Sequence, residues 1–351
     1  MEFSARGLSP DLLPWVPGDS TAEDGERLFQ WIFATELLKQ AWAEARGRRS
    51  QRRIRLCIDA EAPELHTIPW ELLRDPGYGG QVLDLAAATA TPFSRYLEGP
   101  WTPGSVIRKR PIRILVAIAS PENLDGSRLA PIDPEEEFAL MEEAVKGLGV
   151  DVVRLPEPWT LTDLGAALRK GVHFLHLVAH GTFDPEAGAA LYLTDGENQL
   201  ALVDEAEFAA MLRNQLGHTT GEDRLQLVFL AGCQTAARSP ADAFRGLAPK
   251  LVEAGAPAVL AMQDRVGMDT ARAFARTFYE CLLDHGLVDR ACNEARSDLL
   301  TAGVAGAAIP VLFLRVKDGR LLAPPEEAPR KVYTPPPAPD PDELAEHGPL
   351  P

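Results

Sequence analysis

The chain has 351 residues, of which 46% are hydrophobic and 25% charged, and its formal net charge is −16. Such a composition is typical of a soluble globular protein. The acidic balance argues against non-specific binding to nucleic acid, and no apolar run approaches the roughly 20 residues of a membrane helix. The first ten residues, MEFSARGLSP, lack the basic and then apolar order of a signal peptide. We therefore expect a cytoplasmic protein without a nucleic-acid or membrane partner.

The four cysteines, Cys57, Cys233, Cys281 and Cys292, show no CxxC spacing. This argues against both a zinc site and a disulfide framework. Three of them, all except Cys233, fall within strand-like or helical patterns, where a free cysteine packs as a small hydrophobic residue. We expect these three to be structural.

The first hundred residues predict a small helical and strand region. Apolar residues recur at helical spacing over Glu23–Arg49, which indicates one long helix or two joined helices. A strand is expected at 54–60, followed by a turn-rich segment at 68–80 and a possible partner strand at 81–89. The segment Arg46–Arg55 has six arginines in ten residues. Such a charge run is interpreted as a solvated connector, with a partner-docking patch as the alternative.

After residue 105 strands and helices alternate. The expected strands cover 112–120, 150–155, 174–179, 225–231, 257–263 and 309–316. The expected helices cover 134–149, 161–171, 204–217 and 241–255, with two more over 269–300, and a short hairpin includes 191–196. Continuous apolar strands separated by helices predict an α/β fold, with a mostly parallel sheet covered on both faces.

Composition divides the chain into three parts. Residues 1–105 form the N-terminal part, which ends in a joint marked by Pro100, Pro103 and Gly104. Residues 106–323 form the alternating α/β part. Residues 324–351 contain 10 prolines, with six acidic and two basic side chains. This composition predicts a disordered, extended tail.

Two of the apolar strands end in the same way. The stretch FLHLVAHGTFD ends its strand at His180 and Gly181, and LQLVFLAGCQTA ends its strand at Gly232 and Cys233. Sites in parallel sheets form at the carboxyl ends of strands, and neighbouring strands lie roughly 5 Å apart. An imidazole at that distance can take the thiol proton and so produce the nucleophilic thiolate. The glycines allow a substrate to approach closely and let amide N–H groups point at an oxyanion.

A metal site formed by His173, His176 and His180 is a poor alternative. In a strand His173 faces away from the other two, which are themselves about 13 Å apart. Ligands of one zinc ion must all reach it at about 2 Å. We therefore expect neither a metal nor a cofactor.

Four segments resemble the CHAT domains, bacterial caspase-like cysteine peptidases of the caspase–separase–gingipain clan. They are APELHTIPWELLRDP, HFLHLVAHGTFD, LVFLAGCQTA and the segment at 257–296, and the resemblance extends over about 23–320. It implies a caspase-like α/β/α sandwich, with 106–323 as the catalytic domain, and hydrolysis of peptide bonds. It also implies that Cys233 is the nucleophile and His180 the general base and then acid. The backbone N–H groups of Gly181 and Cys233 would form the oxyanion hole, and no acidic third member is required.

The residues of the specificity pocket are assigned from charge complementarity. Some relatives have an acidic residue two positions before the cysteine, where this chain has Ala231. Because a pocket prefers the charge that it complements, we expect cleavage after a basic residue. Asp264 is the better candidate for the pocket and Asp269 the second, with Ser120 also assigned to substrate binding. The alternatives are that Asp264 pairs with a surface cation and that Asp269 caps the next helix.

Regulation is expected to involve a second protein. CHAT domains usually follow repeat arrays or sensor modules, which this sequence lacks, so we expect a separately encoded regulatory or sensor protein as well as a protein substrate. The resemblance implies a cytoplasmic endopeptidase in bacterial antiviral defence or programmed cell death. Two other functions remain open: a catalytically silent docking module of the same fold, and a thiol acyltransferase or amidase.

Overall fold

The computed structural model describes residues 2–4, 16–58, 62–77, 82–97, 106–123, 131–184, 186–218, 221–231, 240–262 and 268–324. Within these ranges, no helix is both long enough and apolar enough to cross a membrane. The expected tail at 324–351 lies almost entirely outside them, as does the joint at 98–105. The proposed division into parts therefore stays a prediction.

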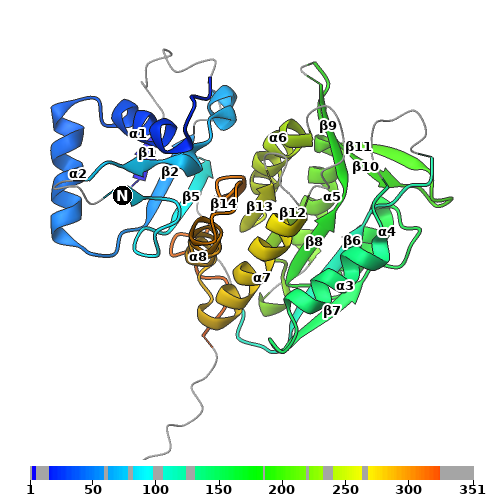
Figure 1. The fold of residues 1–351 in the computed structure, drawn as a ribbon. Helices are drawn as coiled ribbons and strands as arrows, with labels where there is room; N and C mark the ends of the chain where they lie inside the picture. Colours follow the sequence, from blue (N-terminus) through cyan, green and yellow to red (C-terminus); the bar gives the residue numbers. More distant parts are fainter. Residues whose placement is uncertain are drawn as a thin grey trace, which may run out of the picture.

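A nine-stranded sheet runs through the molecule (Figure 1). In sheet order its strands are β1 (Glu2–Ser4), β2 (Ile54–Ile58), β5 (Phe93–Leu97), β14 (Pro310–Leu314), β13 (Ala258–Met262), β12 (Leu227–Ala231), β8 (Phe174–Val178), β6 (Ile112–Ile118) and β7 (Val150–Arg154). All neighbours are parallel except β13 and β14, which are antiparallel. The amino end of β14 therefore lies at the same edge as the carboxyl ends of β13, β12, β8 and β6. The expected mostly parallel sheet is confirmed.

Helices cover both faces of the strands. One face packs against α4 (Leu161–Leu168), α5 (Glu205–His218) and α6 (Pro240–Glu253). The other face packs against α3 (Pro134–Ala144), α7 (Met268–His285) and α8 (Val288–Thr301). Alternate residues of β6 divide between these layers, with Leu115 in the first and Val116 in the second, because successive strand side chains point to opposite faces. The expected α/β/α sandwich is confirmed.

Local signals explain where some helices begin. The side chain of Asp133 accepts hydrogen bonds from the N–H groups of Glu135 and Glu136, and Pro134 occupies the first turn of α3. The carboxylates of Asp133 and of the glutamates in the first turn of α3 interact favourably with the positive end of the helix dipole. In α4, Thr160 and Asp163 form a reciprocal capping box.

A separate antiparallel sheet follows β8. It consists of β9 (His180–Asp184), β10 (Gly188–Thr194) and β11 (Leu200–Asp204), with β10 in the middle. The sequence predicted only a short hairpin in this region. One face of the sheet contributes Ala189, Leu191, Leu193 and Val203 to the core that contains α5 and α6.

The N-terminal region has its own core and joins the large sheet through β5. Helices α1 (Thr21–Ile32) and α2 (Glu36–Arg48) pack against β2 and the 3-10 helices η2 (Pro63–Thr67) and η3 (Trp70–Leu72). Both helices lie to one side of the molecule in Figure 1. The predicted helical stretch is thus two joined helices.

The expected partner strand at 81–89 is wrong. Only β4 (Leu83–Asp84) is a strand there, and it pairs with β3 (Arg74–Asp75) rather than with β2. Strand β2 lies between β1 and β5, and the sequence of β5, FSRYL, does not form an apolar run. Its Arg95 is fully buried, because Glu71 and two backbone carbonyls surround the guanidinium.

The interpretation of the arginine segment as a solvated connector is wrong for three of its members. Arg55 is buried and donates a hydrogen bond to the carbonyl of Val316 at 2.8 Å. Arg53 forms an ion pair with Asp289, a buried residue of α8. Arg46 forms an ion pair with Asp75 inside the N-terminal region, whereas Arg53 and Arg55 tie that region to the rest of the fold.

Candidate active site

His180 lies at the carboxyl edge of the large sheet. It follows β8 after one residue and is the first residue of β9, and its side chain is 1% exposed. The amide of Ala179, between the two strands, donates to the carbonyl of Ala231 at the end of β12, with an N···O distance of 3.3 Å. Gly181 is buried and lies opposite Leu191 of β10. The chain therefore turns from one sheet into the other directly at His180.

Three neighbouring strands end in register at this edge. Ile118 of β6, Val178 of β8 and Ala231 of β12 form one row across the sheet. Two residues beyond each member of this row, the sequence has Ser120, His180 and Cys233. Ser120 and His180 are described by the structure, whereas Gly232 and Cys233 lie outside the described residues. The strands of the expected pair are thus neighbours, and the pair itself stays a prediction.

Ser120 has a local structural partner. Its hydroxyl donates to the carbonyl of Ile132 at 2.6 Å, and the side chain is half-buried. The bond holds the segment before α3 against the end of β6. A role in substrate binding stays a prediction.

The two acidic candidates follow β13, which lies beside β12 as the sequence predicts. Asp264 is two residues past Met262 and lies outside the described residues. Asp269 is fully exposed in the first turn of α7, with a carboxylate oxygen 3.7 Å from a guanidinium nitrogen of Arg272. Its role in the specificity pocket also stays a prediction.

The other two histidines near His180 are engaged elsewhere. Nδ1 of His173 accepts a hydrogen bond from the backbone N–H of Arg113 at 2.8 Å. Nδ1 of His176 is 3.0 Å from the hydroxyl of Tyr279, and burial lowers the pKa of His176 to about 4. Both therefore have structural contacts of their own. Over the described ranges there is no group of three or more His, Cys, Asp or Glu side chains placed to hold a metal ion.

Two of the remaining thiols are protonated at neutral pH. Burial, with a smaller contribution from a hydrogen bond to Glu294, raises the pKa of Cys281 to about 12. Burial likewise raises the pKa of Cys292, which is fully buried, to about 11. Since the thiolate is the nucleophile, neither thiol has the character of an attacking group.

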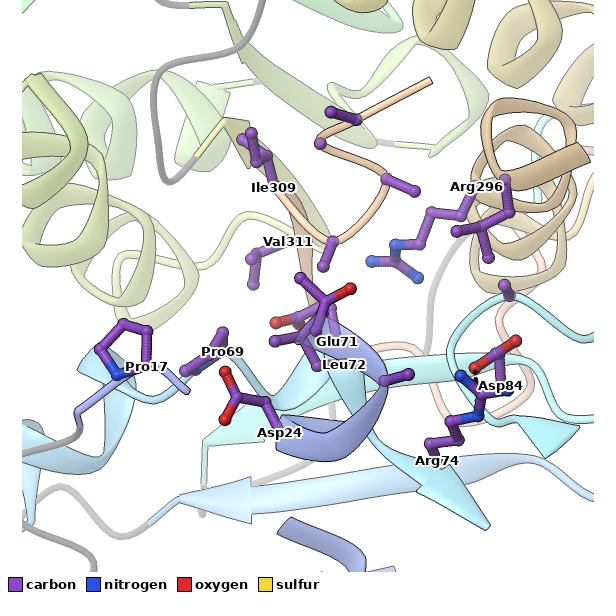
Figure 2. Close-up of a pocket in the computed structure, with 18 of the residues that line it drawn as sticks. Pro17, Asp24, Pro69, Glu71, Leu72, Arg74, Asp84, Arg296, Ile309 and Val311 are labelled. Atoms are coloured by element: carbon purple, nitrogen blue, oxygen red, sulfur yellow. Dashed lines mark ion pairs between the residues drawn. The ribbon is translucent and has the colours of Figure 1, made fainter. Parts of the chain in front are cut away.

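The Pro-Trp-Glu-Leu-Leu segment forms one wall of a cavity of 530 Å³ at the amino end of β14 (Figure 2). Trp70 is buried, and its indole N–H donates to the carbonyl of Leu65 at 2.7 Å. Glu71 accepts two hydrogen bonds from Arg95, at 3.0 and 2.5 Å. This buried ion pair is not apparent from the sequence. The only local signals are a lone glutamate inside an apolar motif and a lone arginine in a short strand.

Arg296 of α8 reaches the same cavity from its opposite side (Figure 2). Its guanidinium donates to the carbonyls of Ala86 and Pro310, at 2.9 and 2.7 Å. These bonds join α8, the N-terminal region and the beginning of β14. The cavity therefore lies at the junction of three parts of the chain, at the same sheet edge as His180.

Comparison with known proteins identifies a family and a fold. The family model described as the CHAT domain matches residues 22–305. No curated protein matches. The chain is similar to the crystal structure of the Arg-specific cysteine proteinase gingipain R, with a TM-score of 0.51 and 10% identity, covering 92% of this chain and 77% of that one. It is similar to the complex of the RgpB pro- and mature domains from Porphyromonas gingivalis, with a TM-score of 0.50 and 10% identity, covering 91% of this chain and 78% of that one.

A weaker likeness is to the separase–securin complex of Saccharomyces cerevisiae. The TM-score is 0.40 and the identity 14%, with 82% of this chain and 17% of that chain covered. At the identities of the gingipain comparisons, the likeness concerns the fold. That fold is the caspase-like one that the sequence motifs imply, and gingipain R, which shares it, is a cysteine proteinase.

Proposed function

The chain belongs to the CHAT domain family, and we propose that it is a cysteine endopeptidase with Cys233 as nucleophile and His180 as general base. The observation that carries the proposal is the register of β8 and β12, in which Val178 lies opposite Ala231. Neighbouring strands are about 4.8 Å apart, and two further residues of chain span at most about 7 Å. In the sequence, Cys233 and His180 each follow one of these two strand ends by two residues.

The proposed reaction uses this pair in two steps. His180 takes the proton of the Cys233 thiol, and the thiolate attacks the carbonyl carbon of the scissile bond. The C–N bond breaks as His180 returns the proton to the leaving amine, which leaves a thioester on Cys233. A water molecule, deprotonated by His180, then hydrolyses the thioester and releases the carboxylate. The N–H groups of Gly181 and Cys233 are the proposed donors to the oxyanion.

Activation by a separate regulatory protein is part of the proposal. A working general base has to lie within hydrogen-bonding reach of the groups that react. The His180 side chain is 1% exposed, so residues that cover it have to move before a protein substrate can reach it. A partner that stabilises the opened state would shift the equilibrium toward activity.

Cleavage after a basic residue is the proposed specificity. One structural neighbour, gingipain R, is an Arg-specific cysteine proteinase, and an acidic pocket complements a basic side chain. Asp264 is the first candidate, because it follows β13, the strand next to β12. Asp269 is the second. Matched peptides with Arg, Asp, Leu or Ala before the bond test this, and a preference for Asp or Leu would contradict it.

The first experiment tests the thiol. A chloroacetamide or acyloxymethyl ketone probe is added to the wild type, Cys233→Ala, His180→Ala and a control, Cys281→Ala, and labelled peptides are mapped by mass spectrometry. We expect labelling at Cys233 in the wild type and in the control, with a large loss in His180→Ala because the thiol loses its base. Equal labelling with and without His180 would contradict the pair.

The second experiment tests hydrolysis. Wild type and Cys233→Ala are incubated with a proteome and with candidate partner proteins, and new peptide termini are compared. Termini that appear only with the wild type support an endopeptidase. If Cys233 is labelled but no protein is cut under any condition, the proposed peptidase is wrong and a silent docking module or a different thiol enzyme takes its place.

A further inference from the structure

A row of side chains leads away from His180 across the small sheet. His180 in β9 lies directly opposite Tyr192 in β10, and Tyr192 lies directly opposite Leu202 in β11. Directly opposite residues of antiparallel strands project on the same face, with Cβ atoms about 4.5–5.5 Å apart. The three residues, here called the His180 row, therefore extend about 10 Å outward from the imidazole.

The His180 row lies on the face of this sheet that points away from α5 and α6, and it becomes exposed from the buried His180 toward Leu202. The opposite face packs against α5 and α6, with Leu191 and Val203 at 1% and 6% exposure. On the face of the row, Tyr192 is half-buried, and Leu202 is 60% exposed. The adjacent rows are Thr182, Ala190 and Asp204 on one side, and Thr194 and Leu200 on the other. An aromatic ring and an isobutyl group thus stand beside His180, and Leu200 adds a second apolar side chain next to Leu202.

The mechanism decides which part of a substrate meets this face. His180 has to give its proton to the amine that leaves, so the residues after the scissile bond lie on the His180 side of Cys233. The strand that leads to His180, β8, and the strand β13 are on opposite sides of β12. The leaving-group side of the substrate therefore runs over β8 and β9, away from β13 and its proposed pocket for the basic residue.

From this geometry, and resting on the proposed peptidase function, we propose that Tyr192 and Leu202 form a subsite for apolar residues on the leaving-group side of the scissile bond. An extended peptide advances about 3.3 Å per residue, and alternate side chains share a face. The first residue after the bond reaches Tyr192, and the third reaches Leu202. The substrate class is thus a peptide that is basic before the bond and apolar after it.

The test compares two peptides within each variant. Both have the same residues up to the bond, chosen from the cleavage mapping, and either Leu or Ser at the first and third positions after it. We expect the wild type to prefer the Leu peptide by roughly tenfold in kcat/KM, because the Leu side chains leave water on binding. Leu202→Ser and Tyr192→Ser are each expected to reduce that ratio about threefold or more.

Two controls separate specificity from general damage. Val153→Ser changes another exposed strand residue, which is 42% exposed on β7, an edge strand of the large sheet. It should leave the ratio unchanged. Tyr192→Phe keeps the ring and should also keep the ratio. A partly unfolded variant would lower both rates together, so the ratio itself reports on the subsite.

The outcomes distinguish this subsite from the function on which it rests. A reporter amide that ends in a fluorophore directly after the bond measures hydrolysis without any residue in the subsite. If the wild type hydrolyses the reporter and treats the Leu and Ser peptides equally, the subsite is wrong and the peptidase stands. The subsite is also wrong if Val153→Ser reduces the ratio as much as Leu202→Ser does. If the wild type, tested alone and with the candidate partner proteins, hydrolyses neither the reporter nor any peptide, both proposals fall.

Discussion

Acid is expected to destabilise the protein through a histidine that is not part of the proposed catalytic pair. His176 of β8 lies 3.0 Å from the hydroxyl of Tyr279 and contacts the ring of Phe229, and burial lowers its pKa to about 4. In the unfolded chain its pKa is about 6.5. Between these values the unfolded state binds the proton and the folded state does not. The free energy of unfolding therefore decreases as the pH falls from about 7 to about 4.

The size of this effect follows from the two pKa values. At pH 5 the contribution of His176 is about 2 kcal/mol relative to pH 8. His66 adds about as much, because burial and the charge of Arg95 lower its pKa to about 3. Burial lowers the pKa of His173 as well, which acts in the same direction. Together, His176 and His66 should lower the free energy of unfolding by about 4 kcal/mol over this range.

The free energy of unfolding, measured by urea titration at pH 8 and at pH 5 at 25 °C, tests this prediction. His176→Gln should lose about 2 kcal/mol less than the wild type between the two pH values. The matched control is Tyr279→Phe, which removes the hydroxyl but leaves His176 buried. It should cost about 1 kcal/mol at pH 8 and keep the full pH dependence, because burial is the cause of the shift. If His176→Gln shows the pH dependence of the wild type, the reasoning is refuted.

Three further predictions concern stability and thiol chemistry. Glu71→Gln leaves the buried Arg95 without its carboxylate partner. Urea titration should show a free energy of unfolding lower by about 3–5 kcal/mol. A loss below about 1 kcal/mol would contradict a buried ion pair. In folded Cys233→Ala at pH 8, iodoacetamide should modify neither Cys281 nor Cys292, since burial keeps both thiols protonated, and peptide mapping that finds either one alkylated would disprove it. The amide of Ala323 donates to the carbonyl of Ile107 close to the end of the described chain. Truncation after Ala323 should therefore shift the melting temperature by less than about 2 °C. A loss of several degrees would show that the tail packs against the domain.

The placement of the candidate site shows how far local patterns reach. An apolar run that ends in a polar group beside glycine is visible within ten residues, so both strand ends at His180 and Cys233 are recognisable in the sequence. That the two strands are neighbours, with Val178 opposite Ala231, depends on segments more than 50 residues apart. The surroundings of His180 depend on the same kind of contact, because Tyr192 and Leu202 belong to strands of which the sequence predicted only part.

The sequence by itself determined the order of the helices and of the large sheet's strands after residue 105, because each of these elements has its own hydrophobic period. Only the tertiary structure decided the strand β5 and the role of the arginines. Arg95 and Arg55 have the polarity of surface residues, and they are buried because Glu71 and a carbonyl of Val316, distant in the chain, satisfy their charge and hydrogen bonds. Hydrophobic periodicity in the sequence indicates which face of a helix or strand is apolar. A charged side chain can be buried only when another part of the fold supplies a residue that pairs with it, and the local sequence does not show this.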